Sequence, residues 1–101
     1  MDTAYHIPVL LRESIDGLNI DSNGIYIDVT YGGGGHSRAI LEKISTGKLI
    51  AFDQDKDALT NAIDDNRFHL IHSNFKYLSN FIAYFKIQQV DGILADLGVV
   101  F

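Results

Sequence analysis

Four consecutive glycines, Gly32 to Gly35, separate a segment typical of a strand from one typical of a helix. Glycine lets the backbone turn tightly and approach a ligand, while the amides at a helix N-terminus point outward toward polar ligand groups. We therefore interpret the loop from Thr30 to His36 as a candidate ligand-binding loop. The alternative is a flexible turn with no ligand. Its position favours the first interpretation, because open α/β sheets bind ligands at the carboxyl ends of their strands.

A carboxylate, Asp53, ends the next predicted strand, about 20 residues after Gly32, the spacing at which an acidic residue accepts hydrogen bonds from ribose hydroxyls. We predict this role for Asp53. Asp55, two residues later, is better explained as the cap of a following helix, since acidic residues favour helix N-termini.

Three further side chains are candidates at the same edge. Asp28 lies inside the first strand, where a buried carboxylate needs a partner; bracing the loop and lying near a cofactor are both open. Asp96 closes the fourth predicted strand, where it can bind a cofactor, orient an acceptor amine, or simply face solvent. Phe75 follows the third strand and can either stack on an adenine ring or pack in the core.

The histidines divide into two groups. His36 stands beside the glycines and can contact a ligand. His69 and His72 lie on a predicted strand without the carboxylate or cysteine neighbours of a metal site, so we expect packing or surface roles and predict no metal. The dinucleotide fingerprint G-x-G-x-x-G fails, because Ser37 or Arg38 stands where its last glycine is needed.

Strands and helices alternate along the chain. Pro8 can open a first helix that Gly17 and the following turn residues end. Such alternation predicts βαβ crossovers, a parallel sheet and an α/β fold. The predicted strands are 24–30, 48–53, 68–72 and 90–96, and the predicted helices after the first are 36–44, 55–64 and 77–85.

Composition fits a single globular domain. Apolar residues make up 47% and charged residues 21% of 101 residues, so disorder is not expected. The chain has no cysteine, no secretory signal is apparent, and no apolar run is long enough for a membrane, so we expect a cytoplasmic protein. The net charge of −5 argues against a stand-alone RNA binder.

Three segments together resemble a known family, the bacterial small-subunit ribosomal RNA cytosine-N4 methyltransferases. These are His6-Ile-Pro-Val-Leu-Leu11, the stretch from Gly24 through the four glycines to Arg38, and Asp91-Gly-Ile-Leu-Ala-Asp-Leu-Gly-Val99. The resemblance covers most of the chain but only about the first third of such an enzyme. It implies that residues 1–101 are the N-terminal part of a Rossmann-like methyltransferase domain, with a helical insertion and the C-terminal strands lying elsewhere.

The resemblance also implies S-adenosylmethionine as methyl donor and a cytidine of small-subunit ribosomal RNA as acceptor. It implies six cofactor-binding positions, of which Asp96 is also our candidate for orienting the amine: Gly34, Gly35, His36, Asp53, Phe75 and Asp96.

The sequence departs from the family at two places. Asp53-Gln-Asp-Lys56 replaces a proline-containing version, and after Val99 the family's serine pair and glutamine do not follow. Two alternatives stay open: a non-catalytic cofactor-binding remnant of such an enzyme, and a nicotinamide-dependent dehydrogenase, which the failed fingerprint disfavours.

Overall fold

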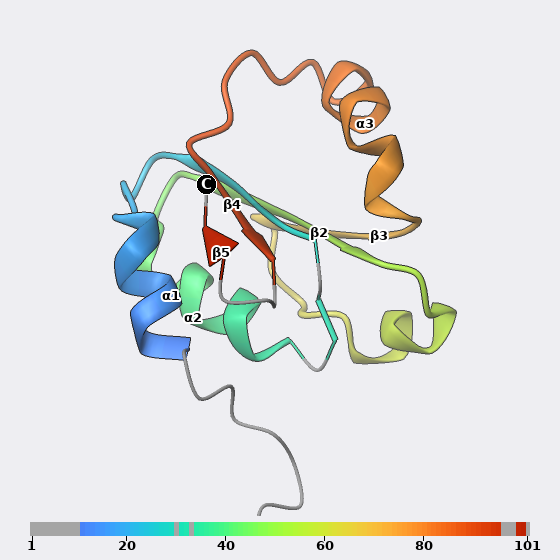
Figure 1. Cartoon of the computed structure of the whole chain (residues 1–101), viewed down its shortest axis with the longest axis horizontal. Coiled ribbons are helices and arrows are strands. Elements are labelled where there is room, and N and C mark those ends of the chain that lie inside the picture. Colours follow the sequence, from blue (N-terminus) through green and yellow to red (C-terminus); the bar gives the residue numbers. More distant parts are fainter. Residues whose placement is uncertain (1–10, 30, 33, 96–98, 101) are drawn as a thin grey trace, which may run out of the picture.

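A mainly parallel sheet forms the centre of the protein, which we describe from a computed structural model covering residues 11–29, 31–32, 34–95 and 99–100 (Figure 1). The strand order is β3-β2-β1-β4-β5, in which the first four strands are parallel and β5 pairs antiparallel to β4. In chain order the elements are α1 (Leu11–Leu18), β1 (Ile25–Asp28), α2 (Gly35–Lys43), β2 (Lys48–Asp53), the 3₁₀ helix η1 (Lys56–Asn61), β3 (Phe68–His72), the 3₁₀ helix η2 (Phe75–Tyr77), α3 (Leu78–Tyr84), β4 (Gly92–Ala95) and β5 (Val99–Val100).

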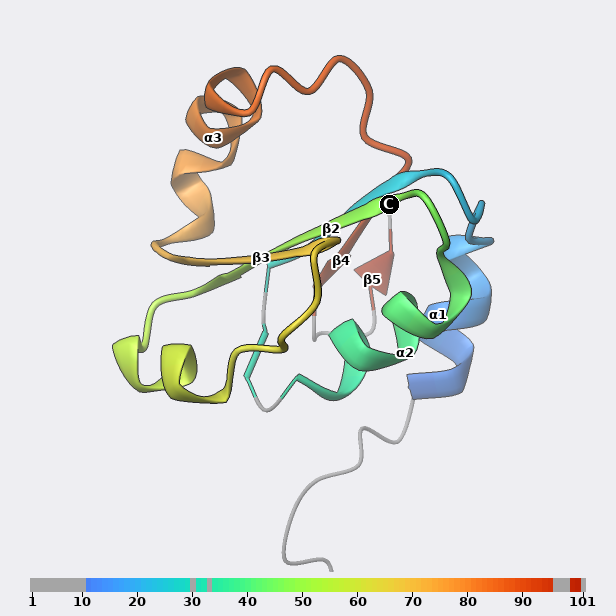
Figure 2. The ribbon, with the colours of Figure 1, turned by 180° about the vertical axis from the view of Figure 1, so that it is seen from behind.

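One face of the sheet is covered by α1 and α2, and we call it the α1/α2 face (Figure 2). Ile40 of α2 and Leu49 of β2 are fully buried there, as are Tyr26 and Leu94 of the two neighbouring strands. Apolar side chains spaced three or four apart on α2 form the stripe that packs on the sheet. This face holds the larger buried cluster, made up of Ile15, Leu18, Tyr26, Tyr31, Ile40, Leu41, Ile44, Leu49, Ala51, Ala58, Phe68 and Leu94.

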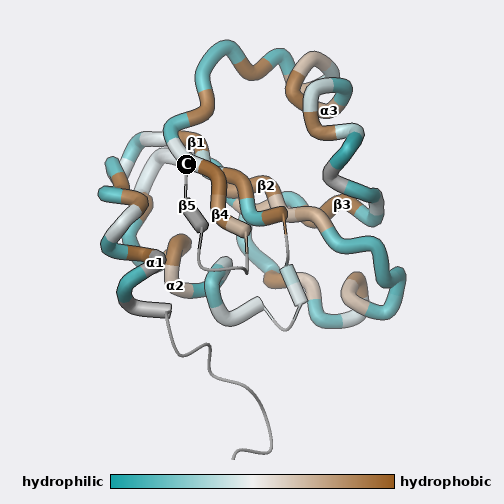
Figure 3. Tube along the Cα trace, in the orientation of Figure 1, coloured by the Kyte–Doolittle hydropathy of each residue, from teal (hydrophilic) through white to brown (hydrophobic). Residues whose placement is uncertain are grey.

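The opposite face, which we call the α3 face, is covered by α3 and by the segment that leads from it to β4. Its fully buried part is small and comes only from the sheet: Ile27, Ile50 and Phe52. Phe81 of α3 contacts Phe52 edge-on, with ring centroids 5.4 Å apart. No residue of α3 is itself buried. Figure 3 shows hydrophobic residues concentrated in the strands between these two layers.

The structure confirms the α/β class, the parallel pairing and the strands 48–53 and 68–72 at their predicted bounds. The other two strands begin later than predicted, at Ile25 and Gly92, and β1 ends at Asp28. The helix predicted for 55–64 is wrong as an α-helix. The segment forms the shorter 3₁₀ helix η1, and Asp55 is its N-cap, as the sequence predicted, since its side chain accepts a hydrogen bond from the Asp57 amide.

Candidate functional site

The carboxyl ends of β1 and β2 bring the glycine loop and Asp53 together. Asp53 ends β2, and its Oδ2 accepts a hydrogen bond of 2.9 Å from the amide of Gly32. Its other oxygen, Oδ1, accepts one of 2.9 Å from the amide of Asp55. The carboxylate therefore fixes the start of the glycine loop against the turn that follows β2. The ribose-binding role expected from the sequence remains a prediction.

Gly34 occupies a position that only glycine fits without strain. Its φ of +86° is in the left-handed region, and it is the residue that precedes α2. A Cβ atom at Gly34 would lie 2.6 Å from a guanidinium nitrogen of Arg38 and 2.8 Å from the hydroxyl oxygen of Tyr31. The arginine can swing away, but the Tyr31 ring is buried and cannot. The loop backbone is thus held in a cradle of side chains.

Tyr31 anchors the loop from below, a role that the sequence did not reveal. Its hydroxyl donates a 2.6 Å hydrogen bond to the carbonyl of Asn61, and its amide donates to the carbonyl of Phe52. The side chain is only 2% exposed. Burial raises the pKa of this hydroxyl above its usual 10.0; the positive charge of Arg38 opposes the rise, while Asp28 and Asp53 add to it. The hydroxyl therefore stays protonated and keeps donating at neutral pH.

Asp28 and Ser37 form a buried polar pair across the loop. Both side chains are fully buried, and the Ser37 hydroxyl donates a 2.7 Å hydrogen bond to Asp28 Oδ2. The pair joins the last residue of β1 to the first turn of α2. Of the two roles left open for Asp28, this contact supports bracing of the loop.

The start of α2 presents backbone amides to the edge of the sheet. Gly35 and His36 are its first two residues, and amides in the first turn have no acceptor within the helix. His36 is 6% exposed, so little of its ring is available to a ligand. Any contact that Gly35 and His36 make with a ligand is therefore expected through their amides.

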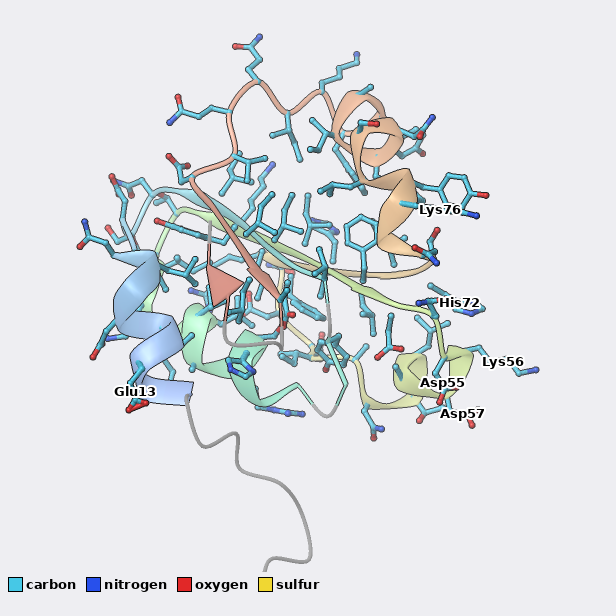
Figure 4. All side chains as sticks on the ribbon, viewed as in Figure 1. Glu13, Asp55, Lys56, Asp57, His72 and Lys76 are labelled. Carbon is cyan, nitrogen blue, oxygen red and sulfur yellow. The ribbon has the colours of Figure 1, made fainter. Side chains whose placement is uncertain are left out.

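The turns after β2 and β3 are joined to each other beside this edge. The Asn74 side-chain amide donates to Gln54 Oε1 over 3.2 Å, and His72 Nε2 lies 2.9 Å from the Gln54 carbonyl oxygen. Figure 4 shows Asp55, Lys56 and Asp57 on the same side of the molecule as His72. These contacts give His72 a surface hydrogen-bonding role and set the position from which η2 begins.

The structure thus brings together four of the six predicted positions: Gly34, Gly35, His36 and Asp53. Phe75 begins η2, directly after the turn that follows β3; its role remains a prediction. Asp96 lies outside the described residues. Among those that are described, no three metal-ligating side chains gather into one group, and none of the helices has the length and apolar character needed to cross a membrane.

A glycine loop after β1 and a carboxylate at the end of β2, in a sheet ordered β3-β2-β1-β4, define a Rossmann-like α/β domain. A solved structure of similar fold is an rRNA methylase from Streptococcus thermophilus, with a TM-score of 0.61 and 26% sequence identity over 76% of this chain and 50% of that one. More specifically, the model of the MraW methylase family matches residues 3–101, and the chain belongs to that family.

Two relatives show how much of such a protein the chain represents. It is 59% identical over 96 residues to the ribosomal RNA small subunit methyltransferase H of Christiangramia forsetii, covering 94% of this chain and 32% of that protein. It is also 59% identical over 99 residues to the protein of the same name from Porphyromonas gingivalis, again covering 32% of it. The chain therefore spans about a third of the length of the relatives it matches.

Proposed function

We propose that the protein is an S-adenosylmethionine-dependent methyltransferase that methylates N4 of a cytidine in small-subunit ribosomal RNA. The observation that carries this proposal is the contact between Asp53 and the glycine loop, in a chain of the MraW methylase family. The names of the relatives and the resemblance in the three sequence motifs support the RNA substrate. Ribosomal RNA as the partner is in keeping with the cytoplasmic location predicted from the sequence.

The residues at the carboxyl edge fit this cofactor. A carboxylate has about four lone-pair positions, and the two oxygens of Asp53 each accept one backbone amide. Asp53 therefore retains the capacity to accept from two ribose hydroxyls. Gly34 and Gly35 carry no side chains of their own, so that a ligand can approach the amides of Gly35 and His36 at the start of α2. We assign Phe75 to the adenine ring, as the resemblance implies.

When bound, S-adenosylmethionine supplies a methyl group on a positively charged sulfur. The carboxylates Asp28 and Asp53 lie at the ends of adjacent strands, and their negative charge favours a cationic ligand at this edge. Asp53 orients the ribose, the loop amides hold the amino-acid end, and Asp96 accepts a hydrogen bond from the cytosine amine. Positioning of this kind supplies most of the rate enhancement in a transfer that needs no covalent intermediate.

The test uses the full-length gene product, calorimetry with S-adenosylmethionine, and nucleoside mass spectrometry of small-subunit RNA after incubation with the labelled cofactor. We expect N4-methylcytidine from the wild type, weak cofactor binding by Asp53→Ala, and lost transfer with weakened cofactor binding for Asp96→Ala. Asp16→Ala, an exposed acidic residue on α1, is the matched control and should behave as wild type. A wild-type protein that binds no S-adenosylmethionine would refute the proposal. One that binds it without transferring a methyl group would support the non-catalytic alternative.

A further inference from the structure

Charge is divided unevenly along the chain. Residues 66–90 contain no Asp or Glu but carry Arg67, Lys76 and Lys86. All 13 acidic residues of the protein, against five of its eight basic ones, lie outside this segment. The segment comprises β3, η2, α3 and the connection to β4. In a protein of net charge −5 this segment has a formal charge of +3. Because Arg67 is ion-paired with Asp65, the charge that the segment offers to a polyanion comes from Lys76 and Lys86.

The same segment exposes aromatic side chains. Tyr77 is 46%, Tyr84 76% and Phe85 36% exposed, and the other large hydrophobic side chain exposed to this degree among the described residues is Leu59. Because three-quarters of the Tyr84 side chain is in water, its burial contributes little to the stability of the fold. Two of these rings, Tyr77 and Tyr84, are seven residues apart, two helical turns, which places them on one side of α3 and its 3₁₀ extension.

The aromatic rings form a connected series from the sheet to the helix. The ring of His69 on β3 lies 5.8 Å from that of Phe85, and Phe85 meets Tyr84 edge-on at 5.3 Å. At the other end of the helix, the Lys76 ammonium lies 5.1 Å from the centroid of the Tyr77 ring. Lys76 lies on η2, which follows β3, and Figure 4 shows it on the same side of the molecule as His72. Lysines and exposed rings therefore occur together at both ends of α3.

A groove of about 410 Å³ runs beneath the connection from α3 to β4, the orange arch in Figure 1. Lys48, Lys86, His69 and Phe85 line it. Asp91, which also lines it, already accepts hydrogen bonds from the Ile25 amide and the Gln89 side chain, at 2.8 Å each. The groove thus offers two ammonium groups and an aromatic wall, while its carboxylate is engaged within the protein.

From this combination we infer that the α3 face, and in particular Tyr77, Tyr84, Phe85, Lys76 and Lys86, binds a single-stranded segment of RNA. Unpaired bases stack on exposed aromatic rings, and phosphates pair with neighbouring lysines; both contacts are independent of sequence. A protein partner or another part of a longer chain would use the exposed rings, but would not require that segment 66–90 carry lysines and no acidic residue. The inference rests on the proposed RNA substrate and adds a binding surface at a distance from the glycine loop.

Fluorescence anisotropy with a short fluorescein-labelled oligocytidylate, recorded over a series of salt concentrations, tests this inference on the full-length protein. Removing one stacking ring costs at least about 1 kcal/mol, so Tyr84→Ala should weaken binding about fivefold or more. Lys86→Gln should reduce the slope of log affinity against log salt by about 0.7. The matched controls are Leu59→Ala, an exposed apolar residue on η1, and Lys43→Gln, an exposed lysine at the end of α2.

The inference is overturned if Tyr84→Ala and Lys86→Gln bind the oligocytidylate like wild type, or if the wild type leaves it unbound because another kind of partner uses this face. Calorimetry with S-adenosylmethionine on the same preparations distinguishes failure of this inference from failure of the proposed function. If the protein binds no S-adenosylmethionine but Tyr84→Ala and Lys86→Gln weaken oligocytidylate binding as expected, the methyltransferase function alone is refuted. Normal cofactor binding with unchanged RNA binding in both variants would refute the α3 surface alone.

Discussion

The two faces of the sheet differ in how completely they are buried. On the α1/α2 face both layers contribute buried residues, among them Ile40 of the helix and Leu49 of the strand, each fully inaccessible. On the α3 face only strand residues are buried, and the helix leaves Tyr84 largely in solvent. The glycine loop belongs to the densely packed face through Tyr31 and Ser37. Dense packing therefore supports the part of the molecule whose backbone geometry must be held, and the looser face presents side chains outward.

Truncating one isoleucine on each face gives the largest expected difference. Ile40→Ala should lower the free energy of unfolding by about 3–4 kcal/mol, because it leaves a cavity between fully buried layers. Ile82→Ala, on the half-buried α3, should cost only about 1 kcal/mol. Urea denaturation of both variants measures this. Equal losses would mean that the two faces are equally well packed and would remove the basis of the comparison.

A glycine pair in the loop sharpens the comparison at the level of the backbone. Gly34→Ala should destabilise the protein by about 1–3 kcal/mol and weaken S-adenosylmethionine binding, because alanine is strained at φ +86° and its Cβ meets Tyr31. Gly35→Ala, the next residue and already in α2, should be neutral or stabilise the helix by up to about 1 kcal/mol. Thermal denaturation and calorimetry provide the two readouts. Similar melting temperatures for the two variants would contradict the claim that position 34 requires glycine.

Removal of the buried serine hydroxyl tests the polar link below the loop. Ser37→Ala takes a donor from the buried Asp28 carboxylate, and we expect a loss of about 1–2 kcal/mol. Ser45→Ala is the control, since its exposed hydroxyl makes only a long contact of 3.4 Å and should cost less than about 0.5 kcal/mol. If chemical denaturation shows no difference between the two, Asp28 does not depend on Ser37.

The smallest expected effect is a loss of stability at low pH that originates on the α1/α2 face. Hydrogen bonds from the side chain and backbone of Arg67 lower the pKa of Asp65 from 3.8 to about 2. The same guanidinium donates to the carbonyls of Leu41 and Ile44, so it also fastens the end of α2.

Because the folded pKa of Asp65 is lowered, its contribution is complete above about pH 4 and is lost as the pH falls toward 2. The stability difference between wild type and Asp65→Asn should therefore shrink over that range. A difference that is constant from neutral pH down to 2 would show that the carboxylate charge contributes nothing.

Local sequence patterns were sufficient to predict an element where the residues of one segment determine its structure. The apolar, β-branched runs 48–53 and 68–72 identified their strands and placed Asp53 at the end of one, but the hydrogen bond from the Gly32 amide to Asp53 was not predicted. The cap at Asp55 was predicted correctly, but the segment after it forms a 3₁₀ helix, and local propensity does not distinguish this from an α-helix.

Hydrogen-bond partners that are distant in sequence could not be predicted from local patterns. The need of Asp28 for a partner followed from the cost of burying a carboxylate, but the choice of Ser37 depends on how α2 returns over the sheet. Tyr31 was overlooked for the same reason, since its hydroxyl reaches Asn61, 30 residues away. An aromatic residue directly before a glycine run was the available signal.

The position of β1 in the sheet has a consequence for folding order. β1 is the first strand in the chain, yet it lies between β2 and β4, the last of the parallel strands. Its amide at Ile25 is bound by Asp91, 66 residues further on. During synthesis β1 therefore remains an edge strand until β4 has emerged, and the central pairing closes only after nearly the whole segment is available. Contacts of such long range slow folding. A nascent chain that ends before Asp91 should accordingly remain sensitive to proteases, in contrast to one that extends beyond β4.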